Sequence, residues 1–313
     1  MKIAILLPAY NEEKTVGKTI EIFYKALPTA SIWVIDNNSI DRTADVSRKV
    51  LASIKSNGGV LFESRQGKGN AVRRAFHDID ADIYVMADAD LTYDPNDLRK
   101  MVELVKTKKA DMVVGDRHSK GDYALNNDRF FHNFGNRLVR YMVNKLFKAN
   151  LKDIMSGYRV FSRFFVKNYP ILVDGFEIET DMTLHALDKK FRIIEVPTSY
   201  KNRPIGSFSK LNTISDGIKV IKTILNIFRH YKPFLFFSFI SLFLIVIGFF
   251  VAIPVFVDWL NYKYIYHIPS AILSVGIEIF ALIIFAIGLI LDSTSFNEKK
   301  SFEVNWLNDT SKF

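Results

Sequence analysis

The sequence predicts an α/β domain with a mostly parallel sheet, followed by two apolar helices that form a transmembrane hairpin. Two observations support this prediction. Residues 1–115 alternate short apolar, β-prone segments with amphipathic ones, which is typical of βαβ units with right-handed crossovers. Residues 234–257 and 268–291 are almost free of charge. Each of these two is long enough to cross a bilayer core of roughly 30 Å as a helix.

The alternation in the N-terminal part defines the individual elements. We expect strands at 2–7, 31–36, 59–62, 83–88 and 111–115, and helices at 12–26, 41–53, 67–79 and 95–107. Further along, 129–148 and 211–232 have the pattern of basic amphipathic helices. Such a helix either packs on its domain or lies on a membrane surface, and we expect the bilayer interface for both.

These elements divide the chain into four parts. We expect an N-terminal domain over 1–210, a juxtamembrane helix over 211–232, the two spans within 233–291 and a polar tail over 292–313. The tail is either disordered or an oligomer contact.

Basic residues flank the outer ends of the two spans. Arg229 and Lys232 precede the first span, and Lys299 and Lys300 follow the second, whereas the loop 258–267 contains one lysine and several aromatic residues. The positive-inside rule therefore places both termini in the cytoplasm. The absence of cysteine agrees with a reducing compartment. We expect a two-span protein of the cell membrane whose N-terminal domain is cytoplasmic.

The formal net charge of +9 indicates an anionic partner. The chain has no nucleic-acid recognition motif and no basic run with stacking aromatic residues, so we expect no nucleic-acid partner. Anionic lipid headgroups and a phosphorylated substrate explain the charge better.

Two carboxylates, Asp88 and Asp90, lie at the carboxyl end of the expected strand 83–88 and precede a polar turn closed by Pro95. The carboxyl end of a core strand faces the crevice in which open α/β sheets bind ligands. A divalent cation would relieve the repulsion between the two acids, and oxygen ligands suit Mg²⁺ or Mn²⁺. Such a metal would hold a diphosphate. The alternative is a solvated pair of acids at a strand end.

Several motifs of the N-terminal domain resemble a known enzyme family. Three motifs resemble the nucleotide-sugar half of family-two glycosyltransferases, which have the Rossmann-like GT-A fold. They are Pro8-Ala9-Tyr10-Asn11-Glu12-Glu13, Val34-Ile35-Asp36-Asn37-Asn38-Ser39 and Asp88-Ala89-Asp90. The polyprenyl-phosphate branch includes dolichol-phosphate mannose synthase and bacterial bactoprenol-phosphate glycosyltransferases. Further motifs of this chain resemble that branch. They are Leu151-Lys152-Asp153-Ile154-Met155-Ser156-Gly157-Tyr158-Arg159 and Gly175-Phe176-Glu177-Ile178-Glu179, together with Arg203, Ser209 and Lys210.

The candidate donor-binding residues follow the expected strands. We assign nucleotide-sugar binding to Pro8, Tyr10, Glu12, Ile35, Asp36, Asn37, Lys68, Asp88, Ala89, Asp90, Arg203 and Lys210. The resemblance implies that Pro8, Tyr10 and Glu12 hold the base and ribose from the loop after the first strand; a plain strand-to-helix turn is the alternative. The segment 35–37 is expected to read the base edge, with helix capping as the alternative for Asp36.

The remaining donor residues are expected near the phosphates. Lys68 lies in a glycine pair that lacks the full phosphate-loop pattern. This segment either simply starts a helix or brings backbone N–H groups and the lysine near a phosphate. Asp88 is assigned to the ribose or the metal, and Asp90 to the metal. Arg203 and Lys210 are expected to close over the diphosphate and neutralise the leaving group.

The candidate catalytic residues are Arg117, Arg129, Asp153, Ser156 and Glu179. The two arginines resemble those that hold the acceptor phosphate, a task that suits the planar guanidinium; surface arginines near the membrane are the alternative. Ser156 is expected to add a hydroxyl donor. Asp153 either orients the reacting groups or is a buried helix cap, and Glu179 alternatively starts a helix.

The resemblance implies an inverting, membrane-anchored glycosyltransferase. It would move a sugar from a nucleotide-sugar, UDP-glucose or UDP-GlcNAc, to undecaprenyl phosphate for cell-envelope glycosylation, with Mg²⁺ or Mn²⁺ as cofactor. A phosphate acceptor is largely dianionic at neutral pH, so it needs positioning and charge neutralisation more than a strong base. Expected partners beyond the bilayer are a second copy of the chain, and a flippase or a downstream lumen-side glycosyltransferase.

Two other functions are alternatives. One is a nucleotide-sugar-binding scaffold without catalysis. The other is a polysaccharide synthase, which would normally have a Gln-x-x-Arg-Trp type motif and more spans than this chain offers.

Overall fold

The computed structural model describes residues 1–120, 130–175, 177–201 and 225–310, with only the helical backbone in 130–134 and 309–310. The chain forms two units, residues 1–217 (unit 1) and 218–313 (unit 2). Arg129, Arg203, Lys210 and most of the expected helix 211–232 lie outside the described residues.

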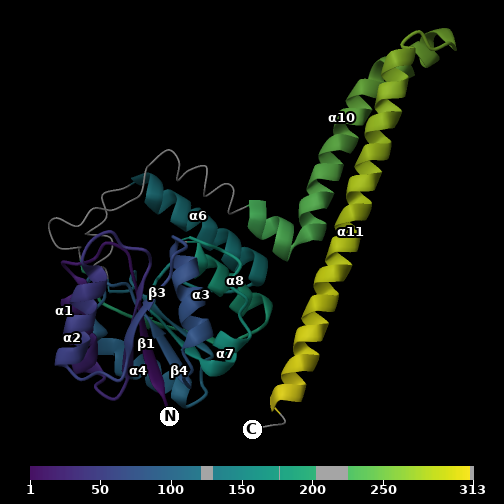
Figure 1. Ribbon diagram of the computed structural model, residues 1–313. Helices are drawn as coiled ribbons and strands as arrows, with labels where there is room; N and C mark the ends of the chain where they lie inside the picture. Colours follow the sequence, from purple (N-terminus) through teal and green to yellow (C-terminus); the bar gives the residue numbers. More distant parts are fainter. Residues whose placement is uncertain (121–129, 176, 202–224, 311–313) are drawn as a thin grey trace. The chain divides into compact units, whose positions relative to one another are not determined.

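Unit 1 is built on a seven-stranded sheet with the order β3-β2-β1-β4-β6-β5-β7 (Figure 1). The strands are β1 (Ile3–Ala9), β2 (Ser31–Asp36), β3 (Gly59–Phe62), β4 (Ile83–Met86), β5 (Met112–Asp116), β6 (Arg159–Ser162) and β7 (Ile193–Pro197). All pairings are parallel except those of β6, which runs antiparallel to both β4 and β5. The prediction of a mostly parallel sheet is confirmed. The sequence did not predict β6 and β7.

The helices of unit 1 lie close to their expected positions. They are α1 (Val16–Ala26), α2 (Thr43–Ser53), α3 (Lys68–Asp78), the short 3₁₀ helix η1 (Pro95–Asp97), α4 (Leu98–Lys106), α6 (Phe130–Phe147), α7 (Arg163–Lys167) and α8 (Ile178–Asp188). Helix α1 begins at Val16 rather than at 12. Asn11 has a left-handed backbone (φ 54°), and its side-chain oxygen accepts a hydrogen bond from Ile40 N at 2.9 Å, so the chain turns before it becomes helical.

Apolar side chains cover both faces of the sheet, as expected for parallel strands. On one face, Ile5 and Leu7 of β1 join a core cluster with side chains of α1, α2 and α4. On the other face, Phe76 of α3 contacts the rings of Tyr84 and Phe161 at 5.8 Å each, and Phe161 stacks on Phe165 of α7. Figure 1 shows α1 and α2 on one side of the strands and α3, α7 and α8 on the other. The sheet is therefore packed between two layers of helices, which hold the carboxyl ends of its parallel strands in place.

Helix α6 confirms the amphipathic helix expected at 129–148, as far as its residues are described. Val139 and Val143 are buried one helical turn apart, whereas Leu138 and Tyr141 are exposed. The helix also contacts α8. One side of α6 therefore packs on unit 1, and apolar side chains remain on another side.

Unit 2 consists mainly of two long helices, α10 (Pro233–Tyr262) and α11 (Ile268–Thr310), which pack along each other as a hairpin (Figure 1). Ser241 Oγ donates to Ala281 O at 2.9 Å, and Ser274 Oγ donates to Gly248 O at 3.1 Å. By length and composition, both helices could cross a membrane. Helix α11 continues far beyond the expected end of the span at 291. The tail is therefore helical up to Thr310, and the alternative of a disordered tail is wrong for these residues.

Candidate active site

The carboxyl ends of β1, β2 and β4 bring several predicted residues to one edge of the sheet. In the register, Pro8 pairs with Ile35, and Ala9 pairs with Asp36. Pro8 thus lies within β1, and the expectation that it belongs to the loop after the strand is wrong. The strand ends two residues later than expected because Asn37 N still donates to Ala9 O at 2.8 Å. Of the three base- and ribose-binding candidates in this motif, Tyr10 and Glu12 lie beyond β1.

Glu12 and Asp36 differ in how the protein holds them. Thr15 Oγ1 donates to Glu12 Oε2 at 2.7 Å, and Glu12 N donates to Thr43 Oγ1 at 2.8 Å. Asp36 is buried, and within the described residues its Oδ1 accepts no hydrogen bond. A buried acceptor of this kind is costly unless a ligand donor reaches it. The role of Asp36 in reading the base edge stays a prediction, and this buried carboxylate oxygen supports it.

Asp90 is held by the turn that follows β4. It is only 3% exposed, and its Oδ1 accepts hydrogen bonds from Thr92 Oγ1 at 2.6 Å and from Thr92 N at 3.1 Å. Leu91, between them, has a left-handed backbone (φ 64°), which a non-glycine residue adopts only at a cost. The protein thus fixes the direction of this carboxylate before any ligand arrives.

Lys68, the first residue of α3, lies between two carboxylates from distant segments. Its Nζ donates to Asp88 Oδ1 and to Glu179 Oε1, the latter at 2.5 Å. Burial lowers the pKa of Lys68, but the charges of Asp88 and Glu179 outweigh burial and raise it above its usual range. The lysine is therefore a permanent cation beside Asp88. The predicted residues Lys68, Asp88 and Glu179 come together here.

The backbone amides at the start of α3 do not face a free site. Gly67 N donates to Asn37 Oδ1 at 2.7 Å, and Gly69 N donates to Asp174 O at 2.8 Å. These two N–H groups therefore already have protein acceptors, and phosphate binding by this segment stays a prediction. Asn37 also donates to Arg65 O at 2.6 Å, so its side chain fixes the loop between β3 and α3.

Arg117 and Asp153 form the second buried ion pair of the site. The Arg117 guanidinium donates from Nε to Asp153 Oδ2 at 2.7 Å and from Nη2 to Asp153 Oδ1 at 2.9 Å. Burial would raise the pKa of Asp153, but Arg117 outweighs it and holds that pKa below its usual range. The guanidinium also lies over the Tyr200 ring, 5.5 Å from its centroid. Asp153 Oδ1 also accepts a hydrogen bond from Met155 N at 3.2 Å, so the carboxylate both orients Arg117 and caps its own loop.

The segment 153–157 joins the two ion pairs. Ser156 is fully buried, and its Oγ accepts a hydrogen bond from Tyr158 N at 3.3 Å. A Cβ at Gly157 would lie 2.8 Å from Lys68 Nζ and 2.9 Å from Asp88 Oδ2, so only glycine lets the backbone approach this closely. Gly157 belongs to the motif 151–159, but the sequence alone did not predict a role for it.

Tyr93 is a second residue that sequence reasoning missed. Its hydroxyl accepts a hydrogen bond from Gly157 N at 2.9 Å, and burial raises its pKa above the usual range. Its position five residues after Asp88, in a polar turn, was the one available signal. Tyr93 therefore supports the segment that passes between the two ion pairs.

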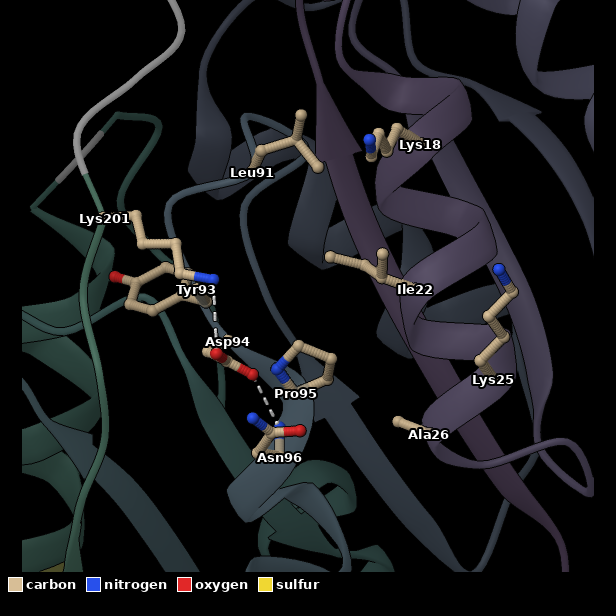
Figure 2. A pocket seen from close by; sticks show the side chains of 10 residues that line it. All are labelled: Lys18, Ile22, Lys25, Ala26, Leu91, Tyr93, Asp94, Pro95, Asn96 and Lys201. Carbon is tan, nitrogen blue, oxygen red and sulfur yellow. Dashed lines mark hydrogen bonds and ion pairs between the residues drawn. The ribbon is translucent and has the colours of Figure 1, made fainter.

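A groove of about 500 Å³ lies beside this site, bordered by α1 and by the chain after Asp90. Figure 2 shows Lys18, Ile22 and Lys25 on its α1 side, and Leu91 and Pro95 across from them. At its rim, Lys201 Nζ lies 3.4 Å from Asp94 Oδ2. None of the predicted donor or acceptor residues that the structure describes lines the groove.

Comparison with known proteins identifies the family. The model of the family described as "Glycosyl transferase family 2" matches residues 4–169. The chain belongs to glycosyl transferase family 2. The chain is also 30% identical to glycosyltransferase AglJ of Haloferax volcanii over 93% of its own length and 92% of that protein. The prediction of a glycosyltransferase is therefore confirmed.

This family-2 glycosyltransferase is also similar to one further protein in sequence and to one solved structure in fold. It is 27% identical to the undecaprenyl-phosphate mannosyltransferase of Micrococcus luteus, over 73% of this chain and 93% of that protein. Its fold is similar to a crystal structure of glucosyl-3-phosphoglycerate synthase from Mycobacterium tuberculosis in complex with Mn²⁺, uridine diphosphate and phosphoglyceric acid. That match has a TM-score of 0.55 and 21% identity over 72% of this chain and 78% of the other. The GT-A fold prediction is confirmed.

The acidic residues of this glycosyltransferase fit a metal that the substrate helps to hold. Within the described residues, no group of three or more His, Cys, Asp or Glu side chains could hold a metal ion by itself. Mg²⁺ typically takes one or two protein carboxylates and completes its shell with water and substrate phosphate oxygens. The oriented carboxylate of Asp90 suits this mode. Asp88 suits it less, since Lys68 already binds its Oδ1.

Proposed function

We propose that the chain transfers a sugar from UDP-glucose or UDP-GlcNAc to undecaprenyl phosphate, with inversion at the anomeric carbon. The observation that supports this most is the short segment 153–157, which touches two ion pairs at once. Asp153 belongs to the Arg117 pair, and Gly157 lies against Lys68 and Asp88. A donor site and an acceptor site would thus lie next to each other, as direct transfer requires.

The donor would bind over the carboxyl ends of β1, β2 and β4. The buried Oδ1 of Asp36, which has no hydrogen-bond partner among the described residues, suits the N–H of a base edge, and Tyr10 and Glu12 lie on the adjoining loop. Asp88, held by Lys68, would accept hydrogen bonds from ribose hydroxyls. A Mg²⁺ or Mn²⁺ ion on Asp90 would supply positive charge to the diphosphate as the sugar leaves.

The acceptor phosphate would bind at Arg117. Asp153 orients the guanidinium through two hydrogen bonds, and the planar fork matches two phosphate oxygens. Since the phosphate is itself a dianion, it can attack without a strong general base. Arg129, Arg203 and Lys210 are proposed to add charge from segments outside the described residues.

A transfer assay tests this function. Membranes containing the chain are incubated with undecaprenyl phosphate and a panel of radiolabelled nucleotide-sugars, and the lipid fraction is analysed for an acid-labile glycosyl phosphate. We expect one UDP-sugar to label the lipid, and Asp90→Ala to abolish the labelling. The absence of lipid labelling with every sugar would refute the function, and full activity of Asp90→Ala in EDTA would refute the metal.

We also propose that α10 and α11 cross the cell membrane with both termini in the cytoplasm. The chain lacks cysteine, so single cysteines can report topology. Tyr264 lies in the short turn between the helices, and Asn305 lies near the end of α11. A cysteine at 264 is expected to react with a membrane-impermeant thiol reagent in intact cells, whereas one at 305 is not. The opposite pattern would place unit 1 outside the cell, away from its donor.

A further inference from the structure

Arg159 is a charged side chain buried at the centre of the sheet. It opens β6, its side chain is fully buried, and in the register it pairs with Met86 of β4 and Val114 of β5. Within the described part of the chain, no carboxylate forms an ion pair with it. Burial lowers the pKa of Arg159, yet a guanidinium stays charged in proteins. A buried charge without an ion-pair partner is costly, so its contacts need an explanation.

The guanidinium donates hydrogen bonds to one loop, to helix α8 and, at 3.4 Å, to Met112 Sδ of β5. Nε donates to Ser156 O at 2.8 Å, and Nη2 donates to Ile154 O at 2.8 Å. Nη1 donates to Thr183 Oγ1 of α8 at 3.0 Å, and this hydroxyl lies 2.9 Å from Glu179 O. A planar fork with fixed donor directions holds two carbonyl groups in one geometry, which the flexible ammonium of lysine cannot do.

The carbonyls that Arg159 binds lie between the two functional ends of the same loop. On one side is Asp153, which orients Arg117; on the other is Gly157, which lies against Lys68. A shift of this loop would change the distance between the proposed acceptor and donor sites. Changes of about 1 Å between reacting groups can cost about 10²-fold in rate.

We propose that Arg159 is a positioning residue that sets the distance between the donor and acceptor sites of the transfer reaction. It touches neither substrate. Its charge fixes the carbonyls of 154 and 156, and these fix Asp153 and Gly157. The inference rests on the proposed function, because it needs two substrates that meet across this loop.

The test compares turnover with donor binding. Arg159→Lys keeps the charge but loses the fork, so we expect kcat per folded molecule to fall about 10²-fold. The Kd for the nucleotide-sugar, measured by calorimetry on the full chain in detergent, is expected to stay within about threefold. Arg163→Lys is the matched control, because Arg163 makes an exposed pair with Asp80 at 2.6 Å, and its kcat is expected to be unchanged.

A second variant covers the case in which Arg159→Lys does not fold. Thr183→Val removes the side-chain oxygen that accepts from the guanidinium with little change in shape and leaves the weaker contact with Met112 Sδ, and we expect a roughly fivefold fall in kcat with unchanged donor Kd. Normal kcat per folded molecule in either folded variant, or an equal loss of kcat and donor affinity, would overturn the positioning role. A wild-type chain without transfer activity would instead refute the proposed function.

Discussion

Glutamine in place of Glu179 removes one of the two carboxylates that neutralise buried Lys68. The side chains of Lys68 and Glu179 are each only 7% exposed, so water cannot replace the lost charge. Breaking a buried ion pair from one side typically costs about 3–5 kcal/mol. Because Asp88 remains beside the lysine, we expect the lower end: a loss of about 3 kcal/mol in the free energy of unfolding of unit 1. For a domain of this size, that loss corresponds to a fall in Tm of about 6–12 °C.

Tryptophan fluorescence can follow unit 1 within the full chain. The chain has three tryptophans: Trp33 lies in β2 of unit 1, whereas Trp259 and Trp306 lie in unit 2. In a background with Phe at 259 and 306, Trp33 alone reports thermal unfolding in detergent. The shift is then read as the difference in Tm between Glu179→Gln and this background.

A second variant and a control decide the cause of the shift. Lys68→Met leaves Asp88 and Glu179 without their cation, and adding Glu179→Gln removes one of those two charges. The double variant is therefore expected to be more stable than Lys68→Met alone. Asp80→Asn removes one carboxylate from the exposed pair with Arg163 and is expected to lower Tm much less than Glu179→Gln does. Two results would refute the buried network. One is a fall in Tm for Glu179→Gln no larger than that for Asp80→Asn. The other is a double variant with a lower Tm than Lys68→Met alone.

Three further outcomes follow from the site geometry. Gly157→Ala would bring its Cβ to 2.8 Å from Lys68 Nζ and 2.9 Å from Asp88 Oδ2, so this ion pair has to shift, and we expect a loss of stability together with a roughly tenfold rise in the donor KM; an unchanged KM would contradict the close approach. Arg117→Lys keeps the charge but loses the two-pronged contact with Asp153, so turnover is expected to fall at least roughly tenfold while nucleotide-sugar binding persists, measured by kinetics and calorimetry. The Glu63 side chain accepts two hydrogen bonds from Arg65, which lowers the pKa of Glu63 to about 2. Because this pKa is lower in the folded state than the ordinary value of 4.5, the ionised Glu63 stabilises the fold above pH 4.5, and this stabilisation is lost as the pH falls toward about 2. Glu63→Gln should therefore flatten the pH dependence of Tm between these two values. An unchanged pH profile of Tm would exclude the Glu63–Arg65 pair as its source.

The sequence predicted the elements that depend on local patterns. The strands and helices up to 115 follow from hydrophobic periodicity, and the Asp88-Ala89-Asp90 motif follows from a strand and a turn next to each other in the chain. The same holds for α10 and α11, whose apolar length exceeds anything a small core needs. In these cases, the decisive residues lie within a few positions of one another.

The features that were not predicted depend on contacts between distant residues. Strand β6 has four residues and opens with Arg159, which is typical of a loop or an edge, yet it lies inside the sheet because β4 and β5 both pair with it. Lys68 and Glu179 are 111 positions apart, and nothing local indicates that α8 brings the acid to α3. The close approach of Gly157 to Asp88 likewise exists only once the sheet has formed.

The charges around segment 153–157 give an independent argument for a metal. Three buried cations, Lys68, Arg117 and Arg159, lie beside three carboxylates, those of Asp88, Glu179 and Asp153. These charges cancel, and the nearby carboxylate of Asp90 leaves the described site with a negative excess. A nucleotide diphosphate and a phosphate monoester would add several negative charges to a poorly hydrated space, at a high electrostatic cost. The described residues can orient these anions, but the neutralising charge has to come from elsewhere. Arg129, Arg203 and Lys210 are proposed to supply part of this charge, and a divalent cation on Asp90 would supply more at the position where the leaving diphosphate develops its own charge, which is why we expect transfer to depend on Mg²⁺ or Mn²⁺.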